Sequence, residues 1–535
     1  MQASGIPFQE TGFFSGLIRD YLDQVPHLAP FYGRYPTLEA FRDQMGEKAG
    51  HYPAAHREVL HQVLSEQYAS LQVSAATREH LENLRNPNAF TVVTGHQLNL
   101  FTGPLYFLYK ILTTIKLASQ LREEYPEAHF VPVYWMGSED HDFDEVNHFN
   151  FRGKEIRWNR PTGGAVGRMD TNGLDAVFEQ FSKDLGPGTH AAYLKDLFSS
   201  AYLQQPNMAA ATRYLVNELF GDLGLVILDA DDPRLKALFV PHMEQDLFGN
   251  LGQRTVSESI TRLNALSGQY RIQVSPRELN FFYLKDGFRE RLVPHAGGFG
   301  VMESDIRFGA EALREELHSH PERFSPNVVT RPLYQEFLLP NLCYVGGGGE
   351  LAYWLELREY FAQSGVPFPM LLLRNSALVA SAKQQRKAEK LGLQLKALFR
   401  DPDSLVEQRV REISEIPIDF GPQRRHLTEQ FEALYRLAEQ TDKSFLGAVR
   451  AEEARQLKGL DRLEKRLLKA QKRKLSDEVE RIRLLRESLF PQGGLQERNR
   501  NFSEFYLELG PTLREGLLEA FDPMAGEFTL LVYEP

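Results

Sequence analysis

Between residues 89 and 135 the chain alternates strand, loop, helix and strand, and this unit constrains the fold more than any other feature. Residues 89–94 (Ala-Phe-Thr-Val-Val-Thr) form a short β-branched run that a glycine-containing loop follows. Residues 105–121 carry the apolar spacing of a helix, and residues 130–135 (Phe-Val-Pro-Val-Tyr-Trp) form a second apolar run. A strand–helix–strand crossover places its two strands side by side and parallel. The unit therefore predicts the beginning of a parallel sheet.

Three further apolar runs of strand length follow, at residues 225–229, 341–345 and 370–373. Segments with a helical apolar pattern lie between them, such as residues 350–361. Runs that are apolar throughout are typical of strands buried on both faces. The five runs together predict an α/β fold, with an open parallel sheet and helices on its faces.

The intervals between the runs indicate additional substructure. Residues 1–85 carry amphipathic helical patterns, interrupted at Pro53, and are expected to form an N-terminal helical segment. The sheet-containing core is expected over residues 86–378. Within it, residues 150–210 and 265–325 are polar or mixed and too long for ordinary connections, so we expect two inserted subdomains.

The C-terminal part is typical of an extended helical arm. No proline occurs in residues 423–490, and apolar residues recur there every three or four positions. We expect a helical coiled-coil domain over residues 379–490, either an antiparallel pair turning between Gly447 and Gly459 or one long helix. Residues 491–535 open with a glycine-rich turn and are expected to pack back on the body.

Composition narrows the possible functions. The formal net charge of -11 disfavours a nucleic-acid-binding protein, which needs an excess of Lys and Arg. Cys343 is the only cysteine, which excludes an internal disulfide and a cysteine-rich zinc site in one chain. Residues 1–21 lack the pattern of a secretory signal, and no stretch approaches ~18 uninterrupted apolar residues. We therefore expect a cytoplasmic protein with no membrane contact.

The loop after the first strand is the first candidate site. It lies between a strand and the start of a helix, where unpaired backbone N–H groups and the helix dipole favour an anion such as phosphate. It matches neither of the common nucleotide-binding glycine motifs. The alternative interpretation is a tight turn without a ligand. The candidate binding residues are Thr94, Gly95, His96, Gln97, Asn99, Thr102 and Gly103.

An acidic cluster follows the second strand, at the edge where open α/β sheets bind ligands. Residues 138–145 read Ser-Glu-Asp-His-Asp-Phe-Asp-Glu. The acids suit a substrate ammonium group, and the histidine suits proton transfer. The alternative is helix capping by Ser138 or Asp140. The candidates are Ser138, Asp140, His141 and Asp142. His96, Asp140, His141 and Asp142 are possible metal ligands by residue type, but their spacing matches no metal-binding signature.

A glycine run after the fourth strand is the third candidate. Gly346 and Gly347 allow close approach to the backbone, and Glu350 begins the next helix. The alternative is a flexible connection with Glu350 as a helix cap. Arg374, directly after the last strand, suits a phosphate or a carboxylate, or else a structural ion pair. Cys343 lies in an apolar stretch, which indicates core packing rather than a nucleophile.

Three long motifs stand in the same order as in a known family. They are Val93-Thr94-Gly95-His96-Gln97 with Phe101-Thr102-Gly103-Pro104 and Tyr109-Lys110, then Ser138-Glu139-Asp140-His141-Asp142, and then Tyr344-Val345-Gly346-Gly347 with Glu350-Leu351-Ala352-Tyr353-Trp354. On these motifs the chain resembles the BshC family of bacillithiol biosynthesis over nearly its whole length. The resemblance implies a Rossmann-like core with two inserted connecting-peptide subdomains, a C-terminal coiled-coil domain, a homodimer and an adenine-nucleotide site near the coiled coil.

The resemblance also implies a reaction, the addition of cysteine to glucosaminyl-malate to form bacillithiol. Because a free carboxylate is a poor acyl donor, we expect ATP, accompanied by Mg²⁺, to activate the cysteine carboxylate before the sugar amine attacks. We expect His96, Asp140, His141 and Asp142 to be catalytic and the other candidates to bind ATP/ADP or substrate.

The core of the family is similar to class I aminoacyl-tRNA synthetases. The loop Gly95-His96-Gln97 departs from their pattern of two histidines flanking a glycine. Two alternatives therefore stay open: a nucleotidyltransferase on a class I synthetase-like core, and a nucleotide-sensing coiled-coil scaffold.

Overall fold

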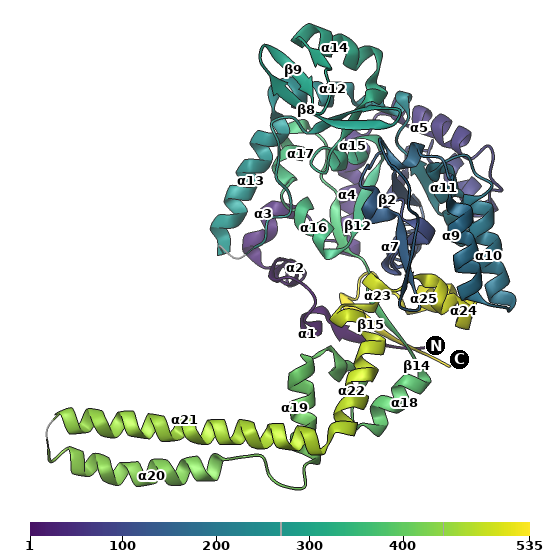
Figure 1. Cartoon of the computed structure of the whole chain (residues 1–535). Coiled ribbons are helices and arrows are strands. Elements are labelled where there is room, and N and C mark those ends of the chain that lie inside the picture. Colours follow the sequence, from purple (N-terminus) through teal and green to yellow (C-terminus); the bar gives the residue numbers. More distant parts are fainter. Residues whose placement is uncertain (268–269, 442, 535) are drawn as a thin grey trace.

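The core of the protein is a parallel five-stranded sheet with the strand order β13-β12-β2-β3-β6. The structure is a computed structural model that describes residues 1–267, 270–441 and 443–534 (Figure 1). The predicted apolar runs are its strands: β2 (Ala89–Gln97), β3 (His129–Gly137), β6 (Val226–Asp229), β12 (Asn341–Gly346) and β13 (Met370–Leu373). The predicted α/β fold is therefore confirmed.

Helix α7 (Tyr106–Glu124) joins β2 to β3 and completes the predicted crossover. Its Leu117 and Leu121 pack with Phe41 of α4 (Leu38–His51) against one face of the sheet. Cys343 is fully buried in the same cluster, and burial raises the pKa of its thiol. The predicted core role of this cysteine is confirmed.

Short helices fill most of the first 85 residues. They are α1 (Phe8–Thr11), α2 (Gly16–Leu22), α3 (Ala29–Tyr32), α4, α5 (Ala54–Gln67) and α6 (Ala75–Asn83). Pro53 lies between α4 and α5, as expected of an interruption. The sequence prediction missed strand β1 (Gln2–Pro7), which pairs antiparallel with β15 (Glu527–Tyr533). Its partner lies at the other end of the chain, and local periodicity carries no sign of such a pairing.

Two substructures interrupt the core between its strands. The first contains the hairpin β4 (His148–Phe151) and β5 (Lys154–Arg157), with α9 (Leu174–Leu185), α10 (Thr189–Tyr202) and α11 (Met208–Phe220). The second contains a separate five-stranded sheet in the order β10-β9-β8-β7-β11, which we call the inserted sheet. Its strands are β7 (Phe281–Lys285), β8 (Phe288–His295), β9 (Gly298–Val301), β10 (Arg307–Phe308) and β11 (Phe324–Pro326).

Further helices surround the second substructure and connect it to the core. They are α12 (Pro233–Gly249), α13 (Leu251–Ser267), α14 (Ala310–Ser319), α15 (Arg331–Leu338), α16 (Gly348–Trp354) and α17 (Arg358–Ser364). The helix expected over residues 350–361 is thus two short helices. The break at residues 355–357 carries the buried Glu356, whose carboxylate accepts backbone hydrogen bonds from another segment.

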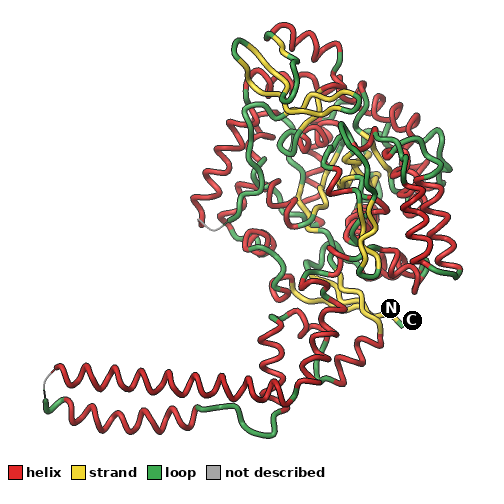
Figure 2. Tube along the Cα trace, viewed as in Figure 1, coloured by secondary structure: helices red, strands yellow, loops and turns green. Residues whose placement is uncertain are grey.

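The helical arm is an antiparallel hairpin that extends away from the body (Figures 1 and 2). Its long helices are α20 (Gly421–Ala438) and α21 (Lys443–Lys474), and α18 (Ala382–Lys390), α19 (Pro402–Ile413) and α22 (Ser476–Leu489) form its base. The coiled coil is confirmed, but the chain reverses between Ala438 and Lys443 rather than between Gly447 and Gly459. Both glycines lie inside α21, where a helical glycine costs only about 1 kcal/mol.

Residues after 490 return to the body through α23 (Gln496–Asn499), α24 (Phe502–Leu509) and α25 (Thr512–Ala520). Strand β15 then pairs with β1 and with β14 (Ala377–Ser381) in a three-stranded sheet at the base of the arm. Strand β14 lies where helical composition is predicted to begin, near Val379, so that expectation is wrong at its first residues. Both termini lie beside this sheet (Figure 1).

Candidate active site

A cleft of about 800 Å³ opens where the core strands end. One wall is the carboxyl edge of the core sheet, and the opposite wall comes from residues 273–277 and from the inserted sheet. A volume of this size is typical of sites for small molecules. The predicted site residues that line the cleft are Gly95, His96, Gln97, Ser138, Asp140, His141, Gly347, Glu350 and Arg374.

The segment predicted to be a loop after the first strand divides into two parts. Its first part, residues 95–97, is instead the end of β2, where it pairs with β3, and it lines the cleft. Its second part is a buried turn in which Phe101, Thr102 and Gly103 all have positive φ angles, of 46°, 68° and 61°. The Phe101 ring anchors this turn among four other aromatic rings. Asn99, Thr102 and Gly103 lie in this second part, outside the lining of the cleft.

Other contacts also limit where an anion could lie along this loop. The N–H of Leu105, just before α7, already donates to the carbonyl of Arg500 at 2.7 Å. Thr94 uses its hydroxyl to donate to the carbonyl of Val345 at 2.8 Å. The part of the loop that remains available to a ligand is therefore residues 95–97.

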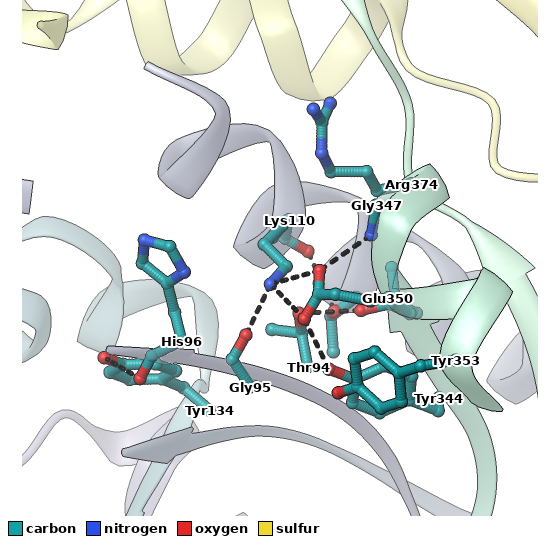
Figure 3. Close-up of polar contacts among 12 residues, drawn as sticks. Thr94, Gly95, His96, Lys110, Tyr134, Tyr344, Gly347, Glu350, Tyr353 and Arg374 are labelled. Carbon is teal, nitrogen blue, oxygen red and sulfur yellow. Dashed lines mark hydrogen bonds and ion pairs between the residues drawn. The ribbon is translucent and has the colours of Figure 1, made fainter. Parts of the chain in front are cut away.

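Lys110 and Glu350 form an ion pair at the base of the cleft (Figure 3). The Lys110 ammonium also donates to the carbonyl of Gly95, and the Glu350 carboxylate accepts from Tyr344 Oη at 2.7 Å and from Gly347 N–H at 2.8 Å. Burial raises the pKa of Glu350, but the charge of Lys110 and these hydrogen bonds outweigh it and lower the pKa to about 2. Glu350 therefore remains an anion that caps α16 and ties β12 to α7.

His96 faces the cleft as a neutral imidazole. Burial, followed by the positive charge of Lys110, lowers its pKa to about 3. The ring packs against Tyr106 and Phe107, and its buried Nε2 has no hydrogen-bond partner among the described residues. A buried ring nitrogen without a hydrogen-bond partner lowers the stability of the folded protein unless a ligand or a water molecule forms a hydrogen bond with it.

Asp140 is held in place by three hydrogen bonds. Its carboxylate accepts from Gln97 Nε2 at 2.7 Å and from the backbone N–H groups of His141 and Asp142 at 2.7 and 3.3 Å. Burial raises the pKa of Asp140, but hydrogen bonds from His141 and Gln97 and the charge of Arg289 together hold it well below its usual range. Asp140 is therefore ionised at neutral pH.

The neighbours of Asp140 have different surroundings. His141 Nδ1 lies 2.6 Å from Arg289 Nη1, and because a guanidinium only donates, this ring nitrogen is the acceptor. Asp142 is exposed at the N-cap of α8 (Phe143–Val146), outside the cleft lining, and its side chain makes no capping hydrogen bond.

Two further acids of this edge are already paired. Ser138 donates to Asp229, and Glu139 forms an ion pair with the buried Lys236 at 2.7 Å. Asp140 therefore differs from Glu139 in that its hydrogen-bond donors are an amide side chain and the backbone, and it forms no ion pair with Lys or Arg among the described residues.

Arg374 forms the structural ion pair that the sequence left as an alternative. Its Nη2 lies 2.5 Å from Glu497 of α23, and its Nη1 donates to Asn375 and Ser376. Its Nε, however, is buried without a partner among the described residues. Gly346, which accepts from the Arg374 backbone, has no room for a side chain, because a Cβ would lie 2.8 Å from Leu351.

Several residues of the cleft were not predicted. Lys110, Tyr344 and Tyr353 belong to the quoted motifs but received no role, and Phe282 and the arginines of the opposite wall received none. The unassigned residues include Lys110, Phe282, Arg277, Arg289, Arg291, Tyr344 and Tyr353. The spacing of Arg289 and Arg291 indicates two arginines on the same face of one strand. Whether that face lines a binding site depends on the tertiary structure, which the spacing does not give.

Within the described part of the chain, no group of three or more His, Cys, Asp or Glu side chains is arranged to hold a metal ion. Likewise, none of the helices in that part is both long and apolar enough to cross a membrane.

Glu356 holds a segment that lines the cleft, because it accepts hydrogen bonds from Gln273 and Val274. Its buried carboxyl group should also make the free energy of unfolding depend on pH. It is fully buried and accepts from the N–H groups of Gln273 and Val274 at 2.8 and 3.3 Å, and burial raises its pKa to about 7 despite these bonds. An unfolded glutamate titrates near ~4.3, so between these values the folded state binds more protons and stability falls as pH rises.

We expect Glu356→Gln to remove this loss of stability, which amounts to up to roughly 3–4 kcal/mol across the window. Urea unfolding of both proteins at about pH 5 and about pH 8 measures it. Equal changes with pH in both proteins would show that Glu356 does not titrate in this range.

Comparison with known proteins covers the whole length of the chain. Residues 1–375 match the family described as "Bacillithiol biosynthesis BshC, N-terminal Rossmann-like domain", and residues 377–533 match "Bacillithiol biosynthesis BshC, C-terminal coiled-coil domain". A protein of Christiangramia forsetii is 52% identical over 100% of this chain and 99% of its own length.

More distant relatives extend the similarity. Proteins of Flavobacterium johnsoniae and Cytophaga hutchinsonii are 49% and 37% identical, each over 99% of this chain and over 100% and 98% of their own lengths. All three relatives carry the name "Putative cysteine ligase BshC". A solved structure titled "putative arginyl t-RNA synthetase" of Campylobacter jejuni covers 84% of this chain and 98% of its own, at 9% identity. Its TM-score of 0.22 is too low to infer a common fold.

Proposed function

This chain belongs to the BshC family of bacillithiol biosynthesis, and from that membership we propose that it is the ligase that joins cysteine to glucosaminyl-malate. The product is an amide between the cysteine carboxyl carbon and the glucosamine nitrogen. ATP would supply the activation by transfer of an adenylyl group to the carboxylate with release of pyrophosphate, or of a phosphoryl group with release of ADP. Either transfer gives the acyl carbon a good leaving group, AMP or phosphate. The protein must then bind three substrates in one cleft and bring the amine to the activated carbon.

The observation that carries the proposal is the meeting of three separate motifs at one cleft. Residues 95–97 end β2, Asp140 follows β3, and the glycine segment beginning at Gly347 follows β12. They combine an ionised carboxylate, a neutral imidazole and open backbone around about 800 Å³. Convergent polar groups of this kind in a large cleft are typical of an active site.

The residues present fit a nucleotide. The Nε2 of His96 and the Nε of Arg374 are buried polar atoms without a hydrogen-bond partner among the described residues, and both belong to residues that line the cleft. A side chain at Gly347 would stand 3.8 Å from that arginine nitrogen, so glycine keeps the approach to it open. We place the phosphates, with any accompanying Mg²⁺, along residues 95–97 and the remaining ligand against Gly347 and Glu350.

We place the glucosamine amine at Asp140. The carboxylate stays ionised, attracts the substrate ammonium and orients the nitrogen after its proton is lost. His96 and His141 line the same cleft, so we place them beside the reacting groups. We propose a role in nucleotide binding for Asn99, Thr102 and Gly103 only through the shape of the loop, since they lie in its buried turn.

The test is direct analysis of the products. Purified protein is incubated with ATP, Mg²⁺, cysteine and glucosaminyl-malate, and bacillithiol and the nucleotide products are identified by mass spectrometry. Bacillithiol with AMP indicates an adenylate, and bacillithiol with ADP indicates an acyl phosphate. A nucleotidyl product without bacillithiol would favour a nucleotidyltransferase, and no turnover of a folded protein would favour the scaffold alternative.

We also propose that the protein works in the cytoplasm as a homodimer. Leu437 and Leu463 of the arm are each 52% exposed, although they lie on helices with a coiled-coil pattern. Covering such residues with a second arm would bury apolar surface. Light scattering should therefore give twice the 61.2 kDa of one chain, and a mass of one chain at micromolar concentration would contradict the proposal.

A further inference from the structure

The inserted sheet turns one face toward the cleft. Strands β7 and β8 pair antiparallel, with Phe282 opposite Arg291. Side chains alternate along a strand, so Arg289 and Arg291 share the face of Phe282, and all three line the cleft. Lys285 lies on the other face, where it stands over the Tyr283 ring.

Arg289 is a buried cation that the negative charges of Glu139 and Asp140 stabilise only from beyond ion-pair distance. Only 7% of it is exposed, and its guanidinium donates to Ser325 Oγ, to the carbonyl of Pro326 and to His141 Nδ1. It also lies 3.9 Å from the centroid of the Phe282 ring. None of these partners is an anion, and Arg289 forms no ion pair with a carboxylate in the part of the chain that the structure describes. Burial of a positive charge without a close counterion is energetically unfavourable, and an anion bound in the cleft would offset this penalty.

Two more cations on the same wall are available. Arg291 donates to the neutral Sδ of Met302 at 3.0 Å, and the exposed Arg277 has no side-chain ion pair among the described residues. Both line the cleft with Arg289. Three guanidinium groups therefore face one space, and guanidinium groups bind carboxylates and phosphates in a bidentate manner.

The position of this wall favours the acceptor substrate over ATP. A chain of contacts runs from Gln97 to Asp140, to His141 and on to Arg289. In glucosaminyl-malate the malyl group stands on the ring carbon next to the one that bears the amine. An amine held at Asp140 therefore brings the two malyl carboxylates toward Arg289, whereas residues 95–97 lie at the opposite end of the chain of contacts.

We infer that Arg277, Arg289 and Arg291 form a dicarboxylate subsite that binds the malyl group. The inference rests on the proposed function for the identity of the substrate. It adds a specificity determinant on the inserted sheet, outside the three motifs of the core.

The experiment is calorimetric titration of the full-length protein with glucosaminyl-malate, ATP and cysteine, each alone. We expect Arg291→Gln and Arg277→Gln to weaken glucosaminyl-malate binding at least tenfold and to leave ATP and cysteine binding unchanged, since each variant removes one charged hydrogen-bond donor. Arg291→Lys keeps the charge but loses the bidentate geometry, so its affinity for glucosaminyl-malate should lie between those of Arg291→Gln and the wild type. Lys285→Gln removes a charge from the opposite face of the same strands and should change none of the three.

Unchanged glucosaminyl-malate binding in both glutamine variants would overturn the inference, as would an equal loss of ATP or cysteine binding. Titration needs no turnover, so the outcome is separate from that of the ligase assay. Loss of binding without any bacillithiol synthesis would support the subsite and contradict the ligase. Synthesis with an unchanged KM for glucosaminyl-malate in Arg291→Gln would support the ligase and contradict the subsite, and a wild-type protein that does not bind glucosaminyl-malate would contradict both.

Discussion

Replacement of Glu497 by glutamine is expected to lower the free energy of unfolding by about 3–5 kcal/mol, because it leaves the Arg374 guanidinium buried without its counterion. The side chains of the two residues are only 1% and 4% exposed. Glu497 also accepts from Ser376 Oγ at 3.2 Å and from Ala377 N–H at 3.1 Å. One carboxylate therefore joins the returning C-terminal segment to the end of the core sheet.

The double variant Arg374→Met with Glu497→Gln removes both charges and should recover part of this loss, since the unpaired ion rather than the missing attraction makes the single variant costly. Lys154→Met is the matched control. Its ion pair with Asp184 joins side chains that are 64% and 22% exposed, and it should cost less than about 1 kcal/mol. Urea unfolding measures all three. If Glu497→Gln behaves like the control, the buried pair is not holding the C-terminal segment in place.

The prediction also bears on the role of Arg374. From sequence its position at the end of a strand suited either an anion or an ion pair, and the choice depended on a residue 123 positions away. With both terminal nitrogens engaged, only Nε is left for a ligand. Substitution of Arg374 should therefore affect the stability of the protein more than its affinity for a nucleotide.

The core sheet could be predicted because its strands and their connections are visible in short stretches of the sequence. Each strand is a continuous apolar run, and a crossover helix fixes the direction of the strand that follows. The same rule places Gly95 and Asp140 at one edge, since Gly95 lies near the end of β2 and Asp140 follows β3. Local patterns do not show which distant segment a strand pairs with. Strands β1 and β15, at the two ends of the chain, are an example.

The binding loop shows the same limit within a few residues. His96 and Thr102 are equally suited to a phosphate by residue type. Phe101 decides between them, because its ring packs among aromatic residues that come from positions as distant as Phe149 and Phe502 and draws the second half of the loop away from the cleft. Arg289 is a similar case, since only the orientation of the inserted sheet gives it a role.

Replacement of Asp140 by asparagine is expected to reduce kcat/KM for bacillithiol formation about a hundredfold or more, because a hydrogen bond between charged groups contributes roughly 1.5–3 kcal/mol and also positions the amine. His96→Asn should cost only about tenfold, since a neutral imidazole offers a neutral hydrogen bond of roughly 1 kcal/mol. Steady-state kinetics with glucosaminyl-malate as the varied substrate measures both. Asp144→Asn, an exposed acid of the same cluster outside the cleft, is the control and should remain near wild type.

The pH dependence of the Asp140→Asn defect separates positioning from proton transfer. The pKa of Asp140 is held well below its usual range, so its carboxylate is ionised at every pH at which the enzyme is expected to work. A residue that acts only through its charge then contributes equally across the profile, and the ratio of wild-type to variant kcat/KM should stay constant between about pH 6 and about pH 9. A ratio that changes with pH would show that Asp140 exchanges a proton during the reaction, and a defect below tenfold would remove it from the site of the amine.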